Sequence, residues 1–392
     1  MRRKPYFTTH NRLTLVRNGQ EFIDTCCQMV RAARQKILFH TYAFDADEVT
    51  WPFVDALIEK AAAGIEVFII IDAIGSVEIS SELKARFDQN HVKFSYFAPL
   101  FSKHLENVGR RLHQKVLVID NDQALVGGIN HCQHFIKPAK GEPWLDYALR
   151  LEGEEVYRLQ RKVQRLYAKY FPKHWPRLRK LIAPNDKPPE ECLLVRANAN
   201  DFMRFHSEIY QSYIRAIRMS KRRIQIFATY FLPGKRLLRE LKRARLRGVS
   251  IELIFGATSD HPTERWSSKY LYTWYLKNNF SIYEWDDSII HGKLALIDDE
   301  WLTLGSYNHN HLSRYINLEL NLEVSDRQFA RMISAEIEDV KNHCRVISQQ
   351  SWRQDTTLLH SALYFSTYML ANVITLVSTV FIIRKKEQNF ND

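Results

Sequence analysis

The chain has 392 residues, of which 45% are hydrophobic and 12% aromatic, so its composition excludes wholesale disorder and allows two cores of ordinary size. Lysine and arginine number 56 against 44 aspartates and glutamates, a formal net charge of +12. This excess favours polyanionic partners, either nucleic acid or an anionic membrane surface, and does not choose between them.

Cysteine usage and the first residues indicate the compartment. The chain has five cysteines, an odd number with no regular spacing, and Met1–Pro5 contains no apolar run. A disulfide framework needs paired cysteines, and a secretory signal needs an apolar segment. We therefore expect the body of the protein in a reducing compartment, without a cleaved signal.

The first half alternates strands and helices. We expect a strand and turn at 13–19, a helix at 20–34, a strand at 36–44, a helix at 51–63 and a strand at 65–72. The last of these strands is almost continuously apolar. Doubly buried strands between helices are typical of a mostly parallel sheet covered on both faces. The predicted fold class is therefore α/β, with a mostly parallel mixed sheet flanked by helices in each lobe.

An aromatic and basic loop is expected at 96–111, before the first motif described below. Its aromatic and basic residues are Tyr96, Phe97, Phe101, Lys103, His104, Arg110 and Arg111. Such a loop is either an ordinary surface loop or a contact for lipid headgroups and acyl chains. The sequence leaves both interpretations open.

Two stretches carry nearly the same pattern. The first has His113, Lys115 and Asp120, followed by Gly128 and Asn130; the second has His291, Lys293 and Asp298, followed by Ser306 and Asn308. Each short apolar run predicts a buried strand, with the histidine and lysine on one face. An imidazole beside an ammonium is a poor core pair but suits a site that holds an anion. Two copies with the same spacing predict a duplicated anion site.

A metal site is the competing interpretation for the residues after the first motif. His131, Cys132 and His134 lie close together there. A structural zinc site needs four ligands, and no second cluster of cysteine or histidine completes the set. We therefore predict no metal and no other cofactor.

A proline-rich stretch separates the two halves. A strand expected at 144–150 and a helix at 154–170 complete a first lobe, 1–170. Five prolines then lie among basic residues within 171–192. Because proline cannot continue a helix or donate to a central ladder, this stretch is predicted to be a linker, either solvated or lying on a membrane.

The second half, 193–350, repeats the first. The stretch 223–231 echoes 36–44, and 248–255 echoes 64–71. An internal duplication of this length predicts two similar lobes related by a pseudo-twofold axis. The active site is then expected where the two motifs meet.

The C-terminal segment 358–383 has a different composition. Across 26 positions it contains no Asp, Glu, Lys or Arg, enough for about 39 Å of helix against a hydrocarbon core of roughly 30 Å. Serine, threonine and asparagine make it only moderately apolar, so a membrane span and an interfacial or packed helix both stay open. Arg384–Lys386 follows it, and the orientation is undecided.

The motifs resemble the paired His-Lys-Asp motifs of the phospholipase D superfamily. The similarity runs from about residue 12 to residue 326 and is strongest to bacterial cardiolipin synthases, particularly the B type. Besides the motifs, the segments that carry it are 15–22, 146–153, 228–234 and 317–319.

This resemblance implies phosphatidyl transfer through a phosphohistidine. One histidine attacks phosphorus, and the other protonates the departing oxygen and then deprotonates the incoming hydroxyl. The family favours His113 as the nucleophile and His291 as the general acid and base. Lys115 and Lys293 supply positive charge to the nonbridging oxygens.

Further site residues follow from the same resemblance. Asp146 and Glu319 match acidic positions of the family and are candidates for the acceptors that orient the imidazoles. Asp120 and Asp298 either take part in the site or tie down local backbone. The remaining members of the expected set are the amide donors Asn130 and Asn308, with Gly128 and Ser306 beside them.

The expected function is therefore that of a cardiolipin synthase, which joins two phosphatidylglycerols and releases glycerol. A phospholipase D-type hydrolase or nuclease is the alternative, and a non-catalytic membrane or polyanion binder is a third. Intact motifs argue against the binder. We expect association with a bacterial cell membrane, a cytoplasmic body and no nucleic-acid partner. The second acceptor, phosphatidylglycerol or another alcohol such as phosphatidylethanolamine, and the oligomeric state stay open.

Overall fold

The structure is a computed structural model that describes residues 6–76, 78–99, 110–175, 192–201 and 206–391. Its contacts divide the chain into two compact units, each discontinuous in sequence. Unit 1 comprises residues 1–199, 303–306 and 318–326; unit 2 comprises residues 200–302, 307–317 and 327–392. Most of the predicted linker, and residues 100–109 of the aromatic loop, lie outside the described residues, and the predicted domain boundaries stay predictions.

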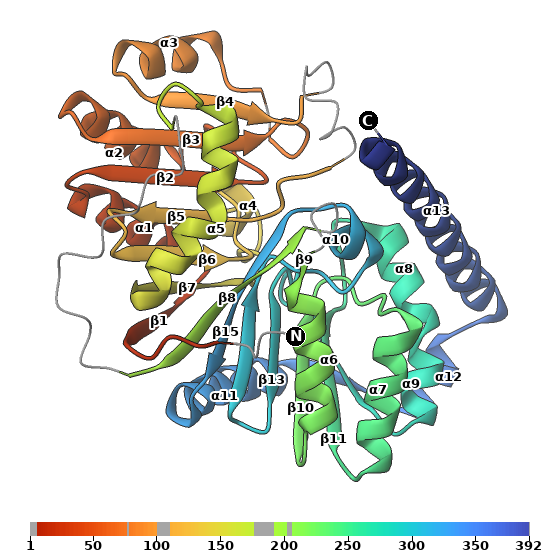
Figure 1. The fold of residues 1–392 in the computed structure, drawn as a ribbon. Coiled ribbons are helices and arrows are strands. Elements are labelled where there is room, and N and C mark those ends of the chain that lie inside the picture. Colours follow the sequence, from red (N-terminus) through yellow and green to blue (C-terminus); the bar gives the residue numbers. More distant parts are fainter. Residues whose placement is uncertain (1–5, 77, 100–109, 176–191, 202–205, 392) are drawn as a thin grey trace. The chain divides into compact units, whose positions relative to one another are not determined.

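The first sheet has seven strands and is mixed. Their spatial order is β1 (Asn11–Arg17), β7 (Tyr147–Gly153), β6 (Gln123–Gly127), β5 (Val116–Ile119), β2 (Lys36–Thr41), β3 (Glu66–Asp72) and β4 (Lys93–Phe97) (Figure 1). Strands β2, β3 and β4 pair in parallel, whereas every neighbouring pair from β1 to β2 is antiparallel. The α/β class and the mixed character of the sheet are confirmed. The prediction that the sheet is mostly parallel is wrong, because four of its six neighbouring pairs are antiparallel.

The second sheet repeats this order. Its nine strands run β9 (His206–Ser207), β8 (Leu194–Asp201), β15 (Glu319–Ser325), β14 (Trp301–Gly305), β13 (Lys293–Ile297), β10 (Arg223–Ala228), β11 (Ser250–Gly256), β12 (Ser281–Trp285) and β16 (Cys344–Ile347). From β8 to β12, each strand occupies the place of its counterpart between β1 and β4 in the first sheet. The predicted duplication is therefore confirmed as two similar sheets.

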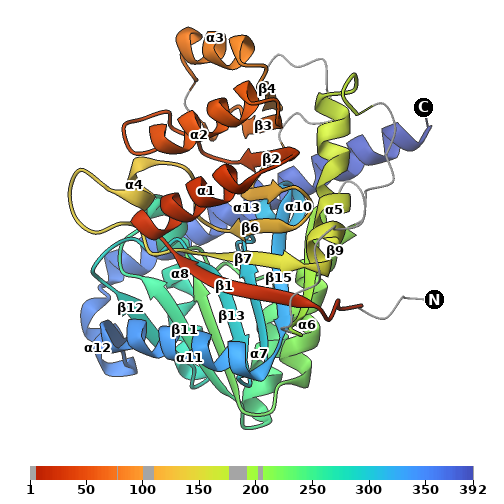
Figure 2. The same cartoon turned by 90° about the vertical axis from the view of Figure 1, so that its left-hand side faces the viewer.

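Helices cover both faces of the first sheet. They are α1 (Gln20–Ala32), α2 (Trp51–Ala62), α3 (Ser81–Gln89), α4 (Gln133–Ile136) and α5 (Glu154–Tyr170). Ile37 and Phe39 of β2 join the apolar core formed with α1 and α2. The alternate residue His40 bonds instead to Tyr167 of α5, which lies on the other face (Figure 2). The alternation along β2 thus positions both layers.

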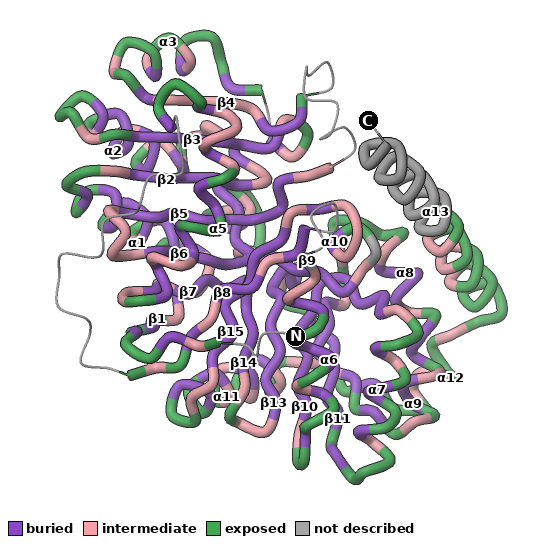
Figure 3. Tube along the Cα trace, viewed as in Figure 1, coloured by how far each residue is buried: buried purple, intermediate pink, exposed green. Residues whose placement is uncertain are grey.

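Unit 2 contains the remaining helices. They are α6 (Glu208–Met219), α7 (Lys235–Leu246), α8 (Pro262–Tyr270), α9 (Tyr272–Lys277), α10 (His311–Tyr315), α11 (Arg327–Asn342), α12 (Gln349–Asp355) and α13 (Leu358–Asn391). Ile224 and Ile226 of β10 pack in a core shared with α6 and α7. Strands of both sheets are largely buried (Figure 3).

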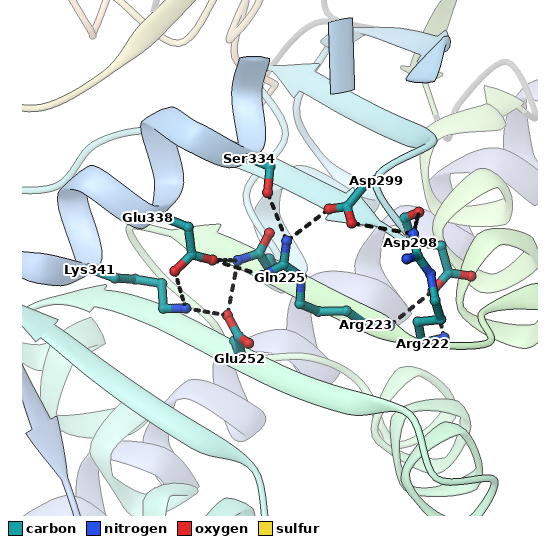
Figure 4. A network of polar contacts seen from close by, with 9 residues as sticks. All are labelled: Arg222, Arg223, Gln225, Glu252, Asp298, Asp299, Ser334, Glu338 and Lys341. Carbon is teal, nitrogen blue, oxygen red and sulfur yellow. Dashed lines mark hydrogen bonds and ion pairs between the residues drawn. The ribbon is translucent and has the colours of Figure 1, made fainter. Parts of the chain in front are cut away.

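The other face of β10 and β11 meets α11 through polar contacts. Arg223 pairs with Asp299 and Glu338, each at 2.8 Å, and Lys341 pairs with Glu252 at 2.7 Å (Figure 4). Such a network fixes the register of the helix on the sheet rather than adding much net stability, because desolvation offsets the attraction.

The C-terminal segment forms the predicted helix. It begins at Leu358 as expected and continues beyond residue 383, since α13 ends at Asn391. Along the described ranges of the chain, we find no helix that combines the length and the apolar character needed to cross a membrane.

Candidate functional site

The first motif places its histidine just outside a strand. Strand β5 begins at Val116, so the prediction that His113 and Lys115 lie on the strand is wrong. The reason is a change of partner: the His113 amide donates to the Leu318 carbonyl at 3.1 Å, ahead of the β5 ladder. The preceding amide, of Leu112, donates to Asp72 Oδ2 at 2.8 Å. These bonds fix the backbone that carries the imidazole.

A buried carboxylate orients the His113 imidazole. Its Nδ1 lies 2.9 Å from Glu319 Oε2 and 3.1 Å from the Ser306 carbonyl oxygen, and Glu319 is fully buried. Both neighbours of Nδ1 are acceptors, so Nδ1 carries the proton and the lone pair of the neutral ring lies on Nε2. The Ser306 hydroxyl also donates to Glu319 Oε2, at 2.5 Å. Three predicted site residues thus come together in unit 1.

Lys115 and Tyr42 lie beside this imidazole. The ammonium of Lys115 donates to the His113 carbonyl at 2.8 Å and lies 5.1 Å from the centre of the Tyr42 ring. The Tyr42 and His113 rings are 5.1 Å apart. Lys115 is only 4% exposed, so its charge acts in a region of low dielectric, where it is weakly screened. Tyr42 was not among the predicted site residues.

Asp146 approaches the glycine turn of the first motif. A Cβ atom on Gly128 would lie 2.5 Å from Oδ2 of Asp146 and nearer still to Oδ1, so only glycine fits there. Asp146 is fully buried and accepts from the Tyr147 amide at 2.7 Å. Asn130 accepts from the Ala43 amide at 3.1 Å. The backbone therefore fixes Oδ1 of Asn130, and the NH₂ group of Asn130 points away from the Ala43 amide.

The second motif lies in unit 2 and has a different arrangement. Strand β13 begins at Lys293, so His291 again precedes the strand. The Lys293 ammonium lies 2.9 Å from His291 Nδ1, donates to the His291 carbonyl and reaches Thr229 Oγ1 at 3.4 Å. A protonated lysine can only donate, so Nδ1 of His291 is the acceptor and the ring proton lies on Nε2. The two histidines thus have opposite tautomers.

An acidic residue that the sequence analysis missed lies near His291. Tyr230 donates to Asp260. Burial disfavours the ionised form of Asp260, but the Tyr230 hydroxyl and the charges of His291, His261 and Lys293 outweigh it, so the pKa of Asp260 is lowered. Asp260 is thus held as an anion facing the motif. The sequence does repeat a Thr-Tyr pair, at 41–42 and 229–230, at or just after the ends of β2 and β10. It marks Tyr230, the partner of Asp260, rather than Asp260 itself.

Asp120 and Asp298 hold backbone. Asp120 accepts from the amides of residues 34, 35 and 36 at 2.6 to 2.8 Å. Asp298 accepts from the amides of residues 221, 222 and 223 at 2.8 to 2.9 Å. Both have a positive φ, 50° and 57°. Of the two roles considered for these residues, the contacts match the tying down of local backbone.

Asn308, the remaining polar residue of the predicted site, is buried. Asn308 is 6% exposed, and among the described residues its Oδ1 has no hydrogen-bond partner. A buried amide oxygen without a partner is costly unless something else binds there. Asn308 is therefore available for a ligand in unit 2.

Two of the three residues considered for a metal, His131 and Cys132, are core side chains, whereas His134 is half-buried. The His131 ring packs against Phe22, Phe39 and Phe53, with centroids 4.6 to 5.0 Å apart, and burial lowers its pKa to about 3. Burial also raises the pKa of the Cys132 thiol. In the part of the chain that the structure describes, no group of three or more His, Cys, Asp or Glu residues is arranged to hold a metal ion.

These contacts define what each motif can do. In unit 1, an imidazole with its lone pair on Nε2 is backed by a buried carboxylate, which stabilises positive charge on the ring as it forms a bond. In unit 2, an imidazole carries its proton on Nε2 and adjoins a buried ammonium. The first arrangement suits a nucleophile and the second a proton donor beside an anion.

Comparisons with known proteins show which family the chain resembles. A family model described as "Cardiolipin synthase, PLD-like domain" matches residues 26–136 and 213–341. Cardiolipin synthase B of Salmonella typhimurium is 31% identical over 343 residues, which cover 86% of this chain and 83% of that protein. Cardiolipin synthase B of Escherichia coli K12 is 32% identical over 325 residues, 81% of this chain and 78% of its own length.

Solved structures show the same fold. A phosphatidylserine synthase from Haemophilus influenzae Rd KW20 has a TM-score of 0.70 and 14% identity, over 96% of each chain. A polyphosphate kinase from Porphyromonas gingivalis has a TM-score of 0.54 and 15% identity, over 83% of this chain and 50% of its own. At these identities the likeness shows the fold alone. Together with the family match and the relatives above 30% identity, it means that this chain belongs to the cardiolipin synthase family with phospholipase D-like domains.

Proposed function

We propose that this phosphatidyltransferase joins two molecules of phosphatidylglycerol into cardiolipin and releases glycerol. The observation that carries the proposal is the 2.9 Å contact between His113 Nδ1 and the buried Glu319 carboxylate. It leaves a lone pair on Nε2 and stabilises the cation that forms when this nitrogen binds phosphorus. The relatives named cardiolipin synthase B supply the substrate class.

The first step is attack of His113 Nε2 on phosphorus. A bond from nitrogen to phosphorus forms, and the bond from phosphorus to the glycerol oxygen breaks. The departing oxygen takes the Nε2 proton of His291, which acts as an imidazolium and becomes the neutral ring. The products are a phosphatidyl-histidine and free glycerol. The geometry of the resting rings supports these roles. His113 offers a lone pair at Nε2, and Nε2 of His291 carries a proton that the ring can give up in its imidazolium form.

In the second step an alcohol attacks the covalent intermediate, and the proton moves to His291 instead of away from it. A hydroxyl of a second phosphatidylglycerol attacks the phosphatidyl-histidine and gives its proton to His291. The bond between phosphorus and His113 breaks, and cardiolipin leaves. An alcohol rather than water must occupy the acceptor position, because water in its place would yield phosphatidic acid.

Charge on the phosphoryl oxygens needs stabilisation in both steps. We assign this to the ammonium groups of Lys115 and Lys293, together with the amides of Asn130 and Asn308. The burial of all four side chains, each at most 6% exposed, supports the assignment, because donors act more strongly in a water-poor site.

Asp146 completes the proposal by analogy within the duplicated chain. Glu319 and Asp146 stand at corresponding places, in or just before the counterpart strands β15 and β7. Since Glu319 orients the first imidazole, we assign Asp146 to the second in its imidazolium form, in which Nδ1 carries a proton that a carboxylate can accept. We place both histidines on one phosphorus. Asp120 and Asp298 then act as positioning residues through the backbone.

The enzyme acts on a lipid at a bacterial membrane surface in this proposal, with its body on the cytoplasmic side. The net charge of +12 supports association with anionic lipids, at about 1 kcal/mol for each basic residue near the surface. Nucleic acid is not a substrate in this account.

The test is product analysis with purified protein and phosphatidylglycerol labelled in its terminal glycerol. We expect cardiolipin and free labelled glycerol in equal amounts. Phosphatidic acid as the main product would assign a hydrolase instead. No turnover, with both histidines intact and the protein folded, would contradict an enzymatic role.

A further inference from the structure

Helix α13 packs on unit 2 through one narrow stripe. Its partly buried residues recur at helical spacing, at positions 364, 367, 368, 371 and 372. The Tyr368 ring stacks on Tyr270 of α8 at 4.5 Å, and Tyr364 stacks on Trp352 of α12 at 6.0 Å. Figure 1 shows α13 running beside α8. This stripe accounts for one side of the helix.

The opposite side of α13 is apolar and exposed. Its exposed large apolar residues are Leu358, Leu359, Leu363, Phe365, Met369, Leu370, Val373 and Ile374. Leu359 is 79% exposed and Leu370 56%. A helix that is apolar all round is normally covered by protein or lipid, because an exposed apolar face of this size is unfavourable in water.

A cavity of about 500 Å³ lies beneath the same helix. Its lining residues include two with apolar rings, Trp274 and Trp352, and two basic ones, Lys269 and Lys277. The Lys269 ammonium forms a long ion pair with the Glu284 carboxylate, at 3.8 Å, whereas Lys277 is exposed. Rings for an apolar chain and an ammonium for a phosphate match the two ends of an anionic lipid.

A basic helix adjoins this cavity. Leu238 of α7 forms part of the cavity wall. The exposed residues of the same helix include Lys235, Arg236, Arg239 and Lys242. Positive charge therefore lies next to an apolar surface, which is the combination that holds a protein on an anionic bilayer.

We propose that the outer face of α13 lies in the interface of an anionic bilayer and that the cavity beneath it binds one phosphatidylglycerol or similar anionic phospholipid. The occupant is lipid rather than a second copy of the chain, because the exposed charged residues of α7 are all basic and would repel its own copy. The site is separate from the motif residues. The inference rests on the proposed membrane association.

The first experiment measures vesicle binding by the full-length protein. Vesicles of phosphatidylcholine with or without phosphatidylglycerol are sedimented with wild type, with Leu359→Glu/Leu370→Glu, and with the control Met219→Glu/Met332→Glu. The control residues are 70% and 46% exposed, lie on α6 and α11, and do not line the cavity. We expect the α13 variant to lose about tenfold in affinity for each substitution and the control to bind as wild type.

The second experiment tests the cavity with short-chain phosphatidylglycerol that carries brominated acyl chains, below its micelle-forming concentration. We expect saturable quenching of tryptophan fluorescence, most of which is lost in Trp352→Phe. Lys277→Glu should raise the half-saturating concentration about tenfold, whereas Lys140→Glu, an exposed lysine of unit 1, leaves it unchanged. Equal quenching in Trp352→Phe, or equal quenching by brominated phosphatidylcholine, would overturn the cavity assignment.

The outcomes separate this inference from the proposed function. Wild-type binding to vesicles with no loss in the α13 variant overturns the inference and leaves the membrane association standing. Absence of wild-type binding overturns both. If the α13 variant turns a dimer into a monomer while vesicle binding is unchanged, the face is a protein interface and the inference fails. Full activity of the α13 variant in detergent micelles, together with lost vesicle binding, supports it.

Discussion

Replacing Glu319 with glutamine isolates the charge behind His113. The His113 Nδ1–H and the Ser306 hydroxyl both donate to the same atom, Glu319 Oε2, at 2.9 Å and 2.5 Å. The glutamine carbonyl oxygen can take that place and accept both bonds, so the geometry is kept and only the negative charge is lost. The variant therefore tests the electrostatic part of the account.

The size of the effect follows from the burial of this pair. A hydrogen bond to a charged group contributes about 1.5–3 kcal/mol, and the pair is shielded from solvent, since Glu319 is fully buried. With about 1.4 kcal/mol for each factor of ten, kcat should fall about ten- to a hundredfold. KM should change little, because the charge acts on the cation formed during the reaction rather than on the bound lipid.

The assay is conversion of phosphatidylglycerol to cardiolipin in mixed detergent micelles, with Tm measured alongside. Glu323→Gln is the matched control, since Glu323 is a buried acid on the same strand that pairs with Arg196 and bonds to Asn198. We expect Glu323→Gln to lower stability and to leave kcat of the folded protein within a few-fold of wild type. An unchanged kcat in Glu319→Gln would refute the reasoning.

Four further predictions concern other parts of the molecule. Gly128→Ala should lower activity at least tenfold and destabilise the fold by about 1–3 kcal/mol, because its Cβ would collide with the Asp146 carboxylate; unchanged kcat and Tm would contradict this. Asp298→Ala removes three bonds to backbone amides and should cost about 2–4 kcal/mol in chemical denaturation, while the protein that stays folded keeps most of its activity. Burial lowers the pKa of His131 to about 3 in the folded protein, from an ordinary value of 6.5, so this residue costs the wild type no stability above pH 6.5 and an increasing amount as pH falls towards 3. His131→Phe should remove this loss, so that at about pH 5 the variant gains about 2 kcal/mol in free energy of unfolding relative to wild type. Denaturant titrations across this pH range measure the gain, and identical pH profiles of the two proteins would count against the prediction. EDTA should leave turnover unchanged, and inhibition that zinc reverses would sink the metal-free chemistry.

The general fold was predictable because the signals are local. Apolar runs such as 36–44 and 65–72 bury both faces of a strand, and the echo at 223–231 and 248–255 shows that the pattern is duplicated. Strand direction was not predictable. The antiparallel pairing of β1 with β7 depends on where distant segments are placed, and an apolar pattern reads the same in both directions.

The candidate site was predictable in its residue types but not in its pairing. Asp146 and Glu319 were both expected to orient an imidazole, yet only the structure places Glu319 against His113, across 206 positions of sequence. Tyr42 and Asp260 were missed because an aromatic residue just after a strand, or an acidic residue in a loop, has many structural roles. The packing of His131 and His309 as core rings was not predicted, although His131 was weighed as a metal ligand and rejected. Each follows a motif asparagine, and each is buried with its pKa lowered to about 3.

The central claim is that His113 and His291 act on one phosphorus. The most direct test is an experimental structure of the full-length protein with tungstate, an anion of the size of phosphate. We predict a single tungstate within hydrogen-bond or bonding distance of Nε2 of both histidines, with Lys115 and Lys293 on its oxygens. Two tungstates in separate cavities, each touching one histidine, would contradict the account.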